Sequence, residues 1–270
     1  MVRLRRVARL TRIHCEYVEF FLVDASTSEI AAVERISVDL LGRLANAVAS
    51  QLEVDAIPKR MVLIGVGKAV ELNRLPAVIR DAPYLRQGSG LWIPRCGIGV
   101  VPLGNGSRVQ RTIIHELVHG LLDQFSDGFK FPRALEEGFA STSEALLTYN
   151  MRKPKQSQIP LCDSGPLNQT ESAKGNVSID RLLGLLENGS NSKEYTDEDY
   201  EASVMGTWLH AFLTRMGRDN RKIRNILGKI QRNGLRSGRE IHIWLMSATG
   251  LTESELDAQF AEFCRGKPPR

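Results

Sequence analysis

Two histidines and a glutamate in the segment TIIHELVHGLL, residues 112–122, have the types and the spacing of a metal site. The chain has only five histidines, and His115 and His119 lie four positions apart. Residues with this spacing share one face of a helix, so both imidazoles could bind the same ion. Neutral imidazole is a good zinc ligand. Glu116 lies about 100° further round the helix, where a carboxylate could act as a general base on a metal-bound water.

The residues around these polar side chains indicate a buried helix. A buried polar group is costly unless it has a partner, so three of them together need a strong reason. The alternative is a pair of histidines satisfied by hydrogen bonds, and we favour the metal site over it. The flanking aliphatic residues are Ile113, Ile114, Leu117, Val118, Leu121 and Leu122.

A second segment offers the ligand that zinc would still lack. Two histidines and a water leave zinc one protein ligand short. The segment FPRALEEGFASTSEAL, residues 131–146, reads as a helix with adjacent carboxylates at Glu136 and Glu137, followed by Gly138. Glycine inside a helix costs about 1 kcal/mol relative to alanine. We therefore expect another element to approach Gly138 closely.

HELVH followed by LEEGFAS resembles the gluzincin branch of the zinc metallopeptidases, which includes thermolysin and the aminopeptidases with an N-E-G-F-A-S stretch. The resemblance implies one zinc ion, with Glu137 as its third ligand. Seventeen residues separate His119 from Glu137, slightly fewer than in the family. Glu136 stands where the aminopeptidases have asparagine, and no exopeptidase signature is seen, so aminopeptidase activity is not implied.

The resemblance also points to supporting residues on the same helix. Ser141 lies one turn after Glu137, where thermolysin-like proteins place an aspartate that orients a histidine ligand. Glu144, two turns after Glu137, could take that role instead. An ordinary polar helix face is the alternative for both residues.

A gluzincin further needs a donor that stabilises the oxyanion of the tetrahedral intermediate. In the family this donor is often a tyrosine or histidine of the C-terminal lobe. The segment YTDEDYEASVMGTWLHAFL, residues 195–213, offers Tyr195, Tyr200 and His210. We favour Tyr200, which begins a helical stripe, and interpret His210 as a half-buried helix histidine.

The segment GIGVVPL, residues 97–103, matches the edge strand along which zincins align an extended substrate. Its backbone would pair with the substrate by strand addition. A plain hairpin strand is the alternative. The residues assigned to this substrate strand are Gly97, Ile98, Gly99, Val100 and Val101.

The remaining pattern predicts an α+β, zincin-like fold in one domain, residues 1–270. Strands are expected at 12–25, 59–66, 90–95 and 97–103, and helices at 26–54, 108–125 and 133–149. The N-terminal lobe, about 12–125, would hold a small mixed sheet and the zinc helix, and the C-terminal lobe, about 126–264, would be mainly helical, with an active-site cleft between them. The polar segment 152–178 is a long loop, which we expect to border the cleft as a lid.

Composition limits the partners. The chain has 270 residues, 42% hydrophobic and 25% charged, as in soluble globular proteins. It shows no membrane-length apolar run and no signal-peptide pattern, so we expect a cytoplasmic protein with no membrane partner. The basic segment RMGRDNRKIRNILGKIQRNGLRSGRE, residues 215–240, lacks interleaved aromatics. We interpret it as a solvated helix face rather than a nucleic-acid site.

These features predict a zinc-dependent peptidase acting on peptides or proteins, with Glu116 as general base. Two alternatives stay open: a zinc-containing hydrolase of a non-peptide amide, and a non-catalytic, zinc-stabilised module that binds peptides. An intact Glu116 favours an enzyme. The sequence leaves the oligomeric state and the cleavage specificity open.

Overall fold

A computed structural model describes residues 9–36, 38–67, 90–94, 97–104, 106–152, 178–184 and 197–264. The chain divides into two compact units, one made of Met1–Ala45 and Ile57–Leu121 and the other of Asn46–Ala56 and Leu122–Arg270. The first contains the sheet and the second is helical, so the predicted α+β class is confirmed. Most of the polar segment 152–178, the predicted lid, lies outside the described residues.

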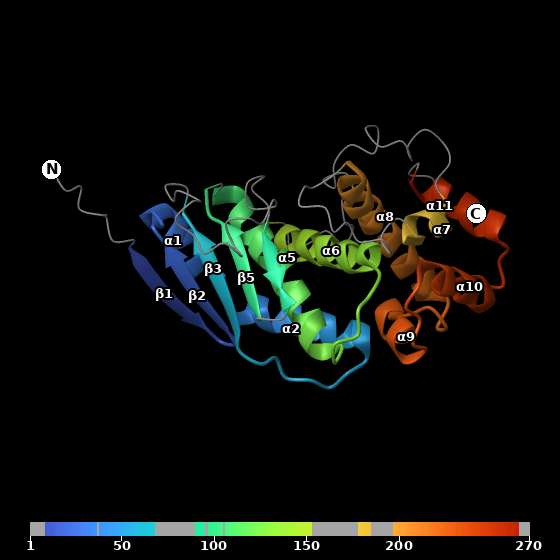
Figure 1. Cartoon of the computed structure of the whole chain (residues 1–270), viewed down its shortest axis with the longest axis horizontal. Coiled ribbons are helices and arrows are strands. Elements are labelled where there is room, and N and C mark those ends of the chain that lie inside the picture. The colour runs from blue at the N-terminus through green and yellow to red at the C-terminus, as the bar shows by residue number, and fades with distance from the viewer. Residues whose placement is uncertain are drawn as a thin grey trace. The chain divides into compact units, whose positions relative to one another are not determined.

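A five-stranded mixed sheet forms the frame of the first unit, in the order β1-β2-β3-β5-β4 (Figure 1). The strands are β1 (Leu10–Cys15), β2 (Val18–Val23), β3 (Met61–Val66), β4 (Leu91–Ile93) and β5 (Ile98–Pro102). β2, β3 and β5 are parallel neighbours, while β1 and β4 run antiparallel at the two ends of the sheet. The strands expected at 90–95 and 97–103 are confirmed as β4 and β5, which pair with each other.

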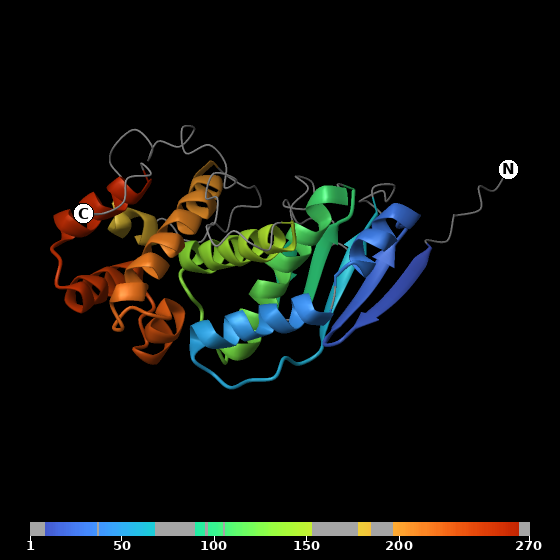
Figure 2. The same ribbon diagram turned by 180° about the vertical axis from the view of Figure 1, so that it is seen from behind.

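One face of the sheet is the hydrophobic core of this unit. Because side chains alternate along a strand, Phe20 and Leu22 of β2 and Leu63 of β3 point to the same side, and all are fully buried. Helices α2 (Val38–Leu52) and α5 (Gly106–Phe125) run along one side of the sheet in Figures 1 and 2. The aliphatic stripe of α2, including Leu44 and Val48, is equally buried.

Two predicted elements are each split in the structure. The expected strand 12–25 is a hairpin of β1 and β2, because Glu16 adopts a left-handed conformation (φ 50°) and reverses the chain. The expected helix 26–54 is interrupted after α1 (Thr27–Glu34), where the amide of Ile36 donates to the carbonyl of Val33. Ser26 caps α1 in a capping box with Glu29.

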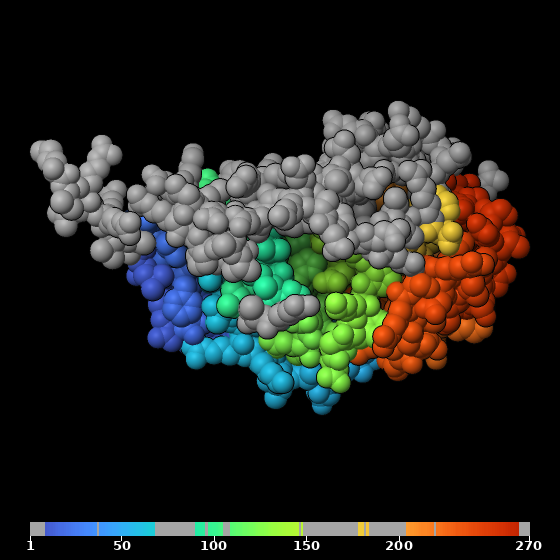
Figure 3. Space-filling model, in the orientation of Figure 1, coloured from blue at the N-terminus to red at the C-terminus, as the bar shows by residue number. Residues whose placement is uncertain are grey.

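The second unit packs helices around an aromatic core. The helices are α6 (Arg133–Arg152), α7 (Ile179–Gly184), α8 (Asp197–Asp219), α9 (Ile226–Arg232), α10 (Gly238–Thr249) and α11 (Glu253–Cys264). Phe212 of α8 lies 5.3 Å from Phe260 and 5.6 Å from Phe263 of α11, between ring centroids. In Figure 3 the C-terminal helices, orange to red, form one closely packed surface.

Helices α6 and α8 cross with their backbones in contact. A Cβ atom on Gly138 would lie 2.1 Å from the carbonyl oxygen of Gly206, and one on Gly206 would lie 2.2 Å from that of Ala134. The expected close approach at Gly138 is thus confirmed, and the neighbouring element is α8. This crossing holds the helix that carries Glu137.

None of the helices in the described ranges combines the length and the apolar content that a membrane crossing requires.

Candidate metal centre

Helix α5 presents the two histidines on one side and buries the aliphatic residues next to them. The imidazole centroids of His115 and His119 are 4.9 Å apart, with the rings edge to face. Ile114, Leu117 and Val118 are fully buried, whereas His119 keeps 8% of its surface exposed and His115 somewhat more. The spacing of four residues therefore places both rings on one side of the helix, beside fully buried aliphatic residues.

Glu116 is buried against the chain that leads into β4. It is 5% exposed, and a Cβ atom on Gly90 would lie 2.4 Å from its Oε1 and 2.7 Å from its Cδ. Only a residue without a side chain fits at position 90 while Glu116 keeps this rotamer. The sequence offers no local signal for this contact, since Gly90 reads as ordinary turn punctuation before a strand.

Contact between α5 and the sheet depends on a second glycine. A Cβ atom on Gly120 would lie 2.6 Å from Sδ of Met61 and 2.7 Å from the indole ring of Trp92. Gly120 directly follows His119, so the helix lies flat on β3 and β4 beside the histidines. This packing fixes the rotation of α5 and therefore the direction in which its polar residues point.

Glu137 occupies the first turns of α6. The guanidinium of Arg133, one turn earlier, lies 3.7 Å from its Oε1. Both side chains are partly exposed, so this pair contributes little to stability. It places the guanidinium of Arg133 beside the carboxylate of Glu137.

His115, His119 and Glu137 form the group that could hold a metal ion. Each offers one ligand atom, and the three atoms lie within 4.8 Å of one another. Zinc binds such atoms at about 2.0–2.2 Å, which places two tetrahedral ligands about 3.4 Å apart, so small side-chain rotations would suffice. Two imidazoles and one carboxylate are a donor set of catalytic zinc sites. The residues present therefore fit the predicted ion.

The structure does not test the roles predicted for Ser141, Glu144 and Tyr200. Ser141 and Glu144 lie partly buried on α6, and their role in orienting a histidine ligand stays a prediction. Tyr200 belongs to the first turn of α8, but its side chain is outside the part of the structure that is described. The choice of Tyr200 as oxyanion donor also stays a prediction.

His210 of α8 is more deeply buried than the sequence suggests. It is 2% exposed, and its Nδ1 lies 3.3 Å from Oγ1 of Thr142. The hydroxyl of Thr142 donates to the carbonyl of Gly138 at 2.7 Å, so its oxygen accepts from Nδ1–H of His210. Burial lowers the pKa of His210 to about 4. A neutral, buried imidazole in this place braces α6 against α8 and does not exchange protons near pH 7.

The predicted substrate strand is wrong, because β5 is not an edge strand. Ile98, Gly99 and Val100 pair with β3 on one side and with β4 on the other, which occupies both edges of the strand. Gly97 precedes the strand in a left-handed turn (φ 62°). Among the described strands, the one at this end of the sheet is β4, a three-residue strand that begins directly after Gly90.

Comparison of the chain with models of known protein families, with curated proteins and with solved structures finds no match.

Proposed function

We propose that this protein is a zinc-dependent peptidase in which His115, His119 and Glu137 hold one zinc ion. The observation that carries the proposal is the proximity of these three ligand atoms, within 4.8 Å. It gains support from Glu116, a buried carboxylate on the same helix as the two histidines. The overall likeness to gluzincins remains part of the proposal.

Each residue has a distinct task in this reaction. The imidazoles of His115 and His119 bind as neutral ligands, and the carboxylate of Glu137 completes the protein ligands. Zinc bound there would polarise the peptide carbonyl and acidify a water molecule. Glu116 takes the proton of that water and passes it to the leaving amine. Burial beside Gly90 holds its carboxylate in one rotamer, which favours proton transfer along a fixed path.

The substrate would align with β4 instead of β5. β4 is an end strand of the sheet, and its first residue, Leu91, follows the glycine that touches Glu116. An extended peptide that adds to this edge would run beside the general base. Backbone pairing of this kind recognises an extended chain and distinguishes peptides from small amides.

Zinc content tests the ligand set. We expect about one zinc per wild-type chain and its loss in His115→Ala and in Glu137→Ala. Glu136→Ala is the matched control, since it removes the adjacent carboxylate on the same helix and should leave zinc in place. Zinc kept by Glu137→Ala and lost by Glu136→Ala would move the third ligand to Glu136.

Glu116→Gln then separates an enzyme from a peptide binder. Glutamine has nearly the same shape, so zinc and fold are retained, but it cannot accept the proton. General-base assistance raises the rate by roughly 10²–10⁴-fold, so the rate of cleavage of a mixed peptide library should drop by a factor in this range. Equal cleavage by both proteins would remove Glu116 from the mechanism. No cleavage of peptides by wild type, with zinc present, would favour a binding module or a different amide substrate.

A further inference from the structure

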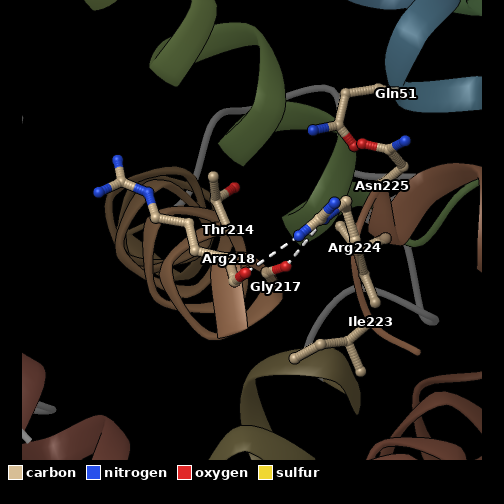
Figure 4. Close-up of a pocket in the computed structure, with 8 residues that line it drawn as sticks. Gln51, Thr214, Gly217, Arg218, Ile223, Arg224 and Asn225 are labelled. Carbon is tan, nitrogen blue, oxygen red and sulfur yellow. Dashed lines mark hydrogen bonds between the residues drawn. The ribbon is translucent and has the colours of Figure 1, made fainter. Parts of the chain in front are cut away.

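A cavity of about 320 Å³ lies in the helical unit, between the ends of α2 and α8 and the start of α9 (Figure 4). α9 packs tightly on the end of α2, because a Cβ atom on Gly228 would lie 2.8 Å from the carbonyl oxygen of Leu52. The cavity is lined by the polar residues Gln51, Thr214 and Arg224, among others. Ile223 and Ile226 add apolar lining. None of these residues belongs to the candidate metal centre.

Arg224 is held in place by the end of α8. Its Nε donates to the carbonyl of Gly217 at 3.2 Å, and its Nη2 donates to that of Arg218 at 3.0 Å. These two bonds orient the guanidinium and leave its other N–H groups for a further acceptor. In the described part of the chain the nearby carboxylate of Glu53 pairs with Lys229 and Arg232, and no ion pair joins a carboxylate to Arg224.

Gln51 turns its amide nitrogen towards the same space. Its Oε1 is buried and has no hydrogen-bond partner among the described residues. The amide can turn about its last torsion, and an anion in the cavity would favour the orientation with the nitrogen towards it. Figure 4 shows the amide nitrogen of Gln51, the hydroxyl of Thr214 and the guanidinium of Arg224 pointing to one region, while Arg218 extends away from it. The three groups come from α2, from α8 and from the turn between α8 and α9, and all three residues line the cavity.

The surrounding charge favours an anion. Residues 215–240 contain nine lysines and arginines and two acidic residues, which gives this segment a formal charge of +7, against +5 for the whole chain. This segment supplies Arg218 and Arg224 to the lining of the cavity, and such basic residues raise the local concentration of anions.

We propose that this cavity binds a small phosphomonoester, with its phosphate group at Gln51, Thr214 and Arg224. A phosphate presents three terminal oxygens to three donors, whereas a carboxylate presents only two, and the arginine fork matches phosphate geometry. The cavity is at the lower end of the range for small-molecule sites, roughly 300–1,000 Å³. It exceeds the size of a bare phosphate ion, so Ile223 and Ile226 are left to contact a small organic group.

Calorimetric titration of the full-length protein at constant ionic strength tests this site, with glycerol 3-phosphate, inorganic phosphate and acetate as probes. We expect glycerol 3-phosphate to bind more tightly than inorganic phosphate, and acetate not to bind. Stronger binding of acetate would reassign the site to carboxylates. Equal binding of both phosphates would overturn the role of the organic group, and the absence of binding by either would overturn the proposal.

Two conservative variants connect binding to the cavity. Gln51→Glu is nearly isosteric but places a negative charge beside the phosphate, so affinity should drop by about tenfold or more. Thr214→Val keeps the shape of the side chain and removes one donor, so affinity should drop by about three- to tenfold. Arg239→Gln removes an exposed charge of the same basic segment on α10 and should change affinity by less than about twofold. Equal losses in Arg239→Gln and Gln51→Glu would mean that diffuse charge, and not the cavity, binds the anion.

Discussion

Replacing Gly138 by alanine should destabilise the protein, although alanine is the better helix former. Gly138 lies inside α6, and a Cβ atom there would lie 2.1 Å from the carbonyl oxygen of Gly206 and 2.4 Å from its carbonyl carbon. An ordinary carbon–oxygen contact is about 3.4 Å, so α6 and α8 would have to separate by about 1.3 Å at this point. The obstacle is backbone, which cannot rotate away as a side chain would.

The expected size of the effect follows from two opposing contributions. Alanine in place of glycine gains about 1 kcal/mol of intrinsic helix stability. Overpacking of a close contact costs about 1–3 kcal/mol or more, and separating the helices also weakens the bond between His210 and Thr142. Because a backbone clash lies at the upper end of that range, we expect a net loss of about 2 kcal/mol in the free energy of unfolding.

Urea unfolding followed by circular dichroism measures this loss as a lower midpoint. Gly42→Ala is the matched control, since Gly42 lies inside α2 and its Cβ would meet nothing within 4 Å. The control should gain about 0.5–1 kcal/mol. A gain in Gly138→Ala similar to that of the control would refute the close crossing of α6 and α8.

Three further predictions rest on single contacts. Gly90→Ala should keep zinc but lower kcat by at least about tenfold, because the new Cβ would lie 2.4 Å from Oε1 of Glu116. An unchanged kcat would show that this contact does not orient the general base. Burial lowers the pKa of His210 to about 4 from its ordinary 6.5. Between pH 6.5 and pH 4 the unfolded chain therefore binds more protons than the folded protein. The free energy of unfolding should fall by about 3 kcal/mol as the pH drops over this range. Urea midpoints across that range measure the slope, and His210→Gln should flatten it. Tyr17→Phe removes a 2.6 Å hydrogen bond to the carbonyl of Leu41 and should cost about 1 kcal/mol in the same assay, whereas no loss would mean that water replaces the hydroxyl.

The sequence alone determined the elements that depend on local pattern. The aliphatic spacing around His115 and His119 predicted a buried helix, and the structure has one at Gly106–Phe125. The segment with Glu137 likewise predicted the helix Arg133–Arg152. Helical spacing is a property of neighbouring residues, so it can be read from the chain without knowledge of the fold. The choice of Glu137 over Glu136 came from resemblance to a family and needs the zinc measurement.

Only the tertiary structure decided which elements meet. GIGVVPL has the composition of a strand, but whether a strand lies at the edge depends on the partners that other parts of the chain supply, and β5 has one on each side. The glycines follow the same rule: Gly90 and Gly138 are glycine because Glu116 and Gly206 occupy the space of a side chain. Such contacts join residues 26 and 68 positions apart, a separation at which local sequence carries no information about distance.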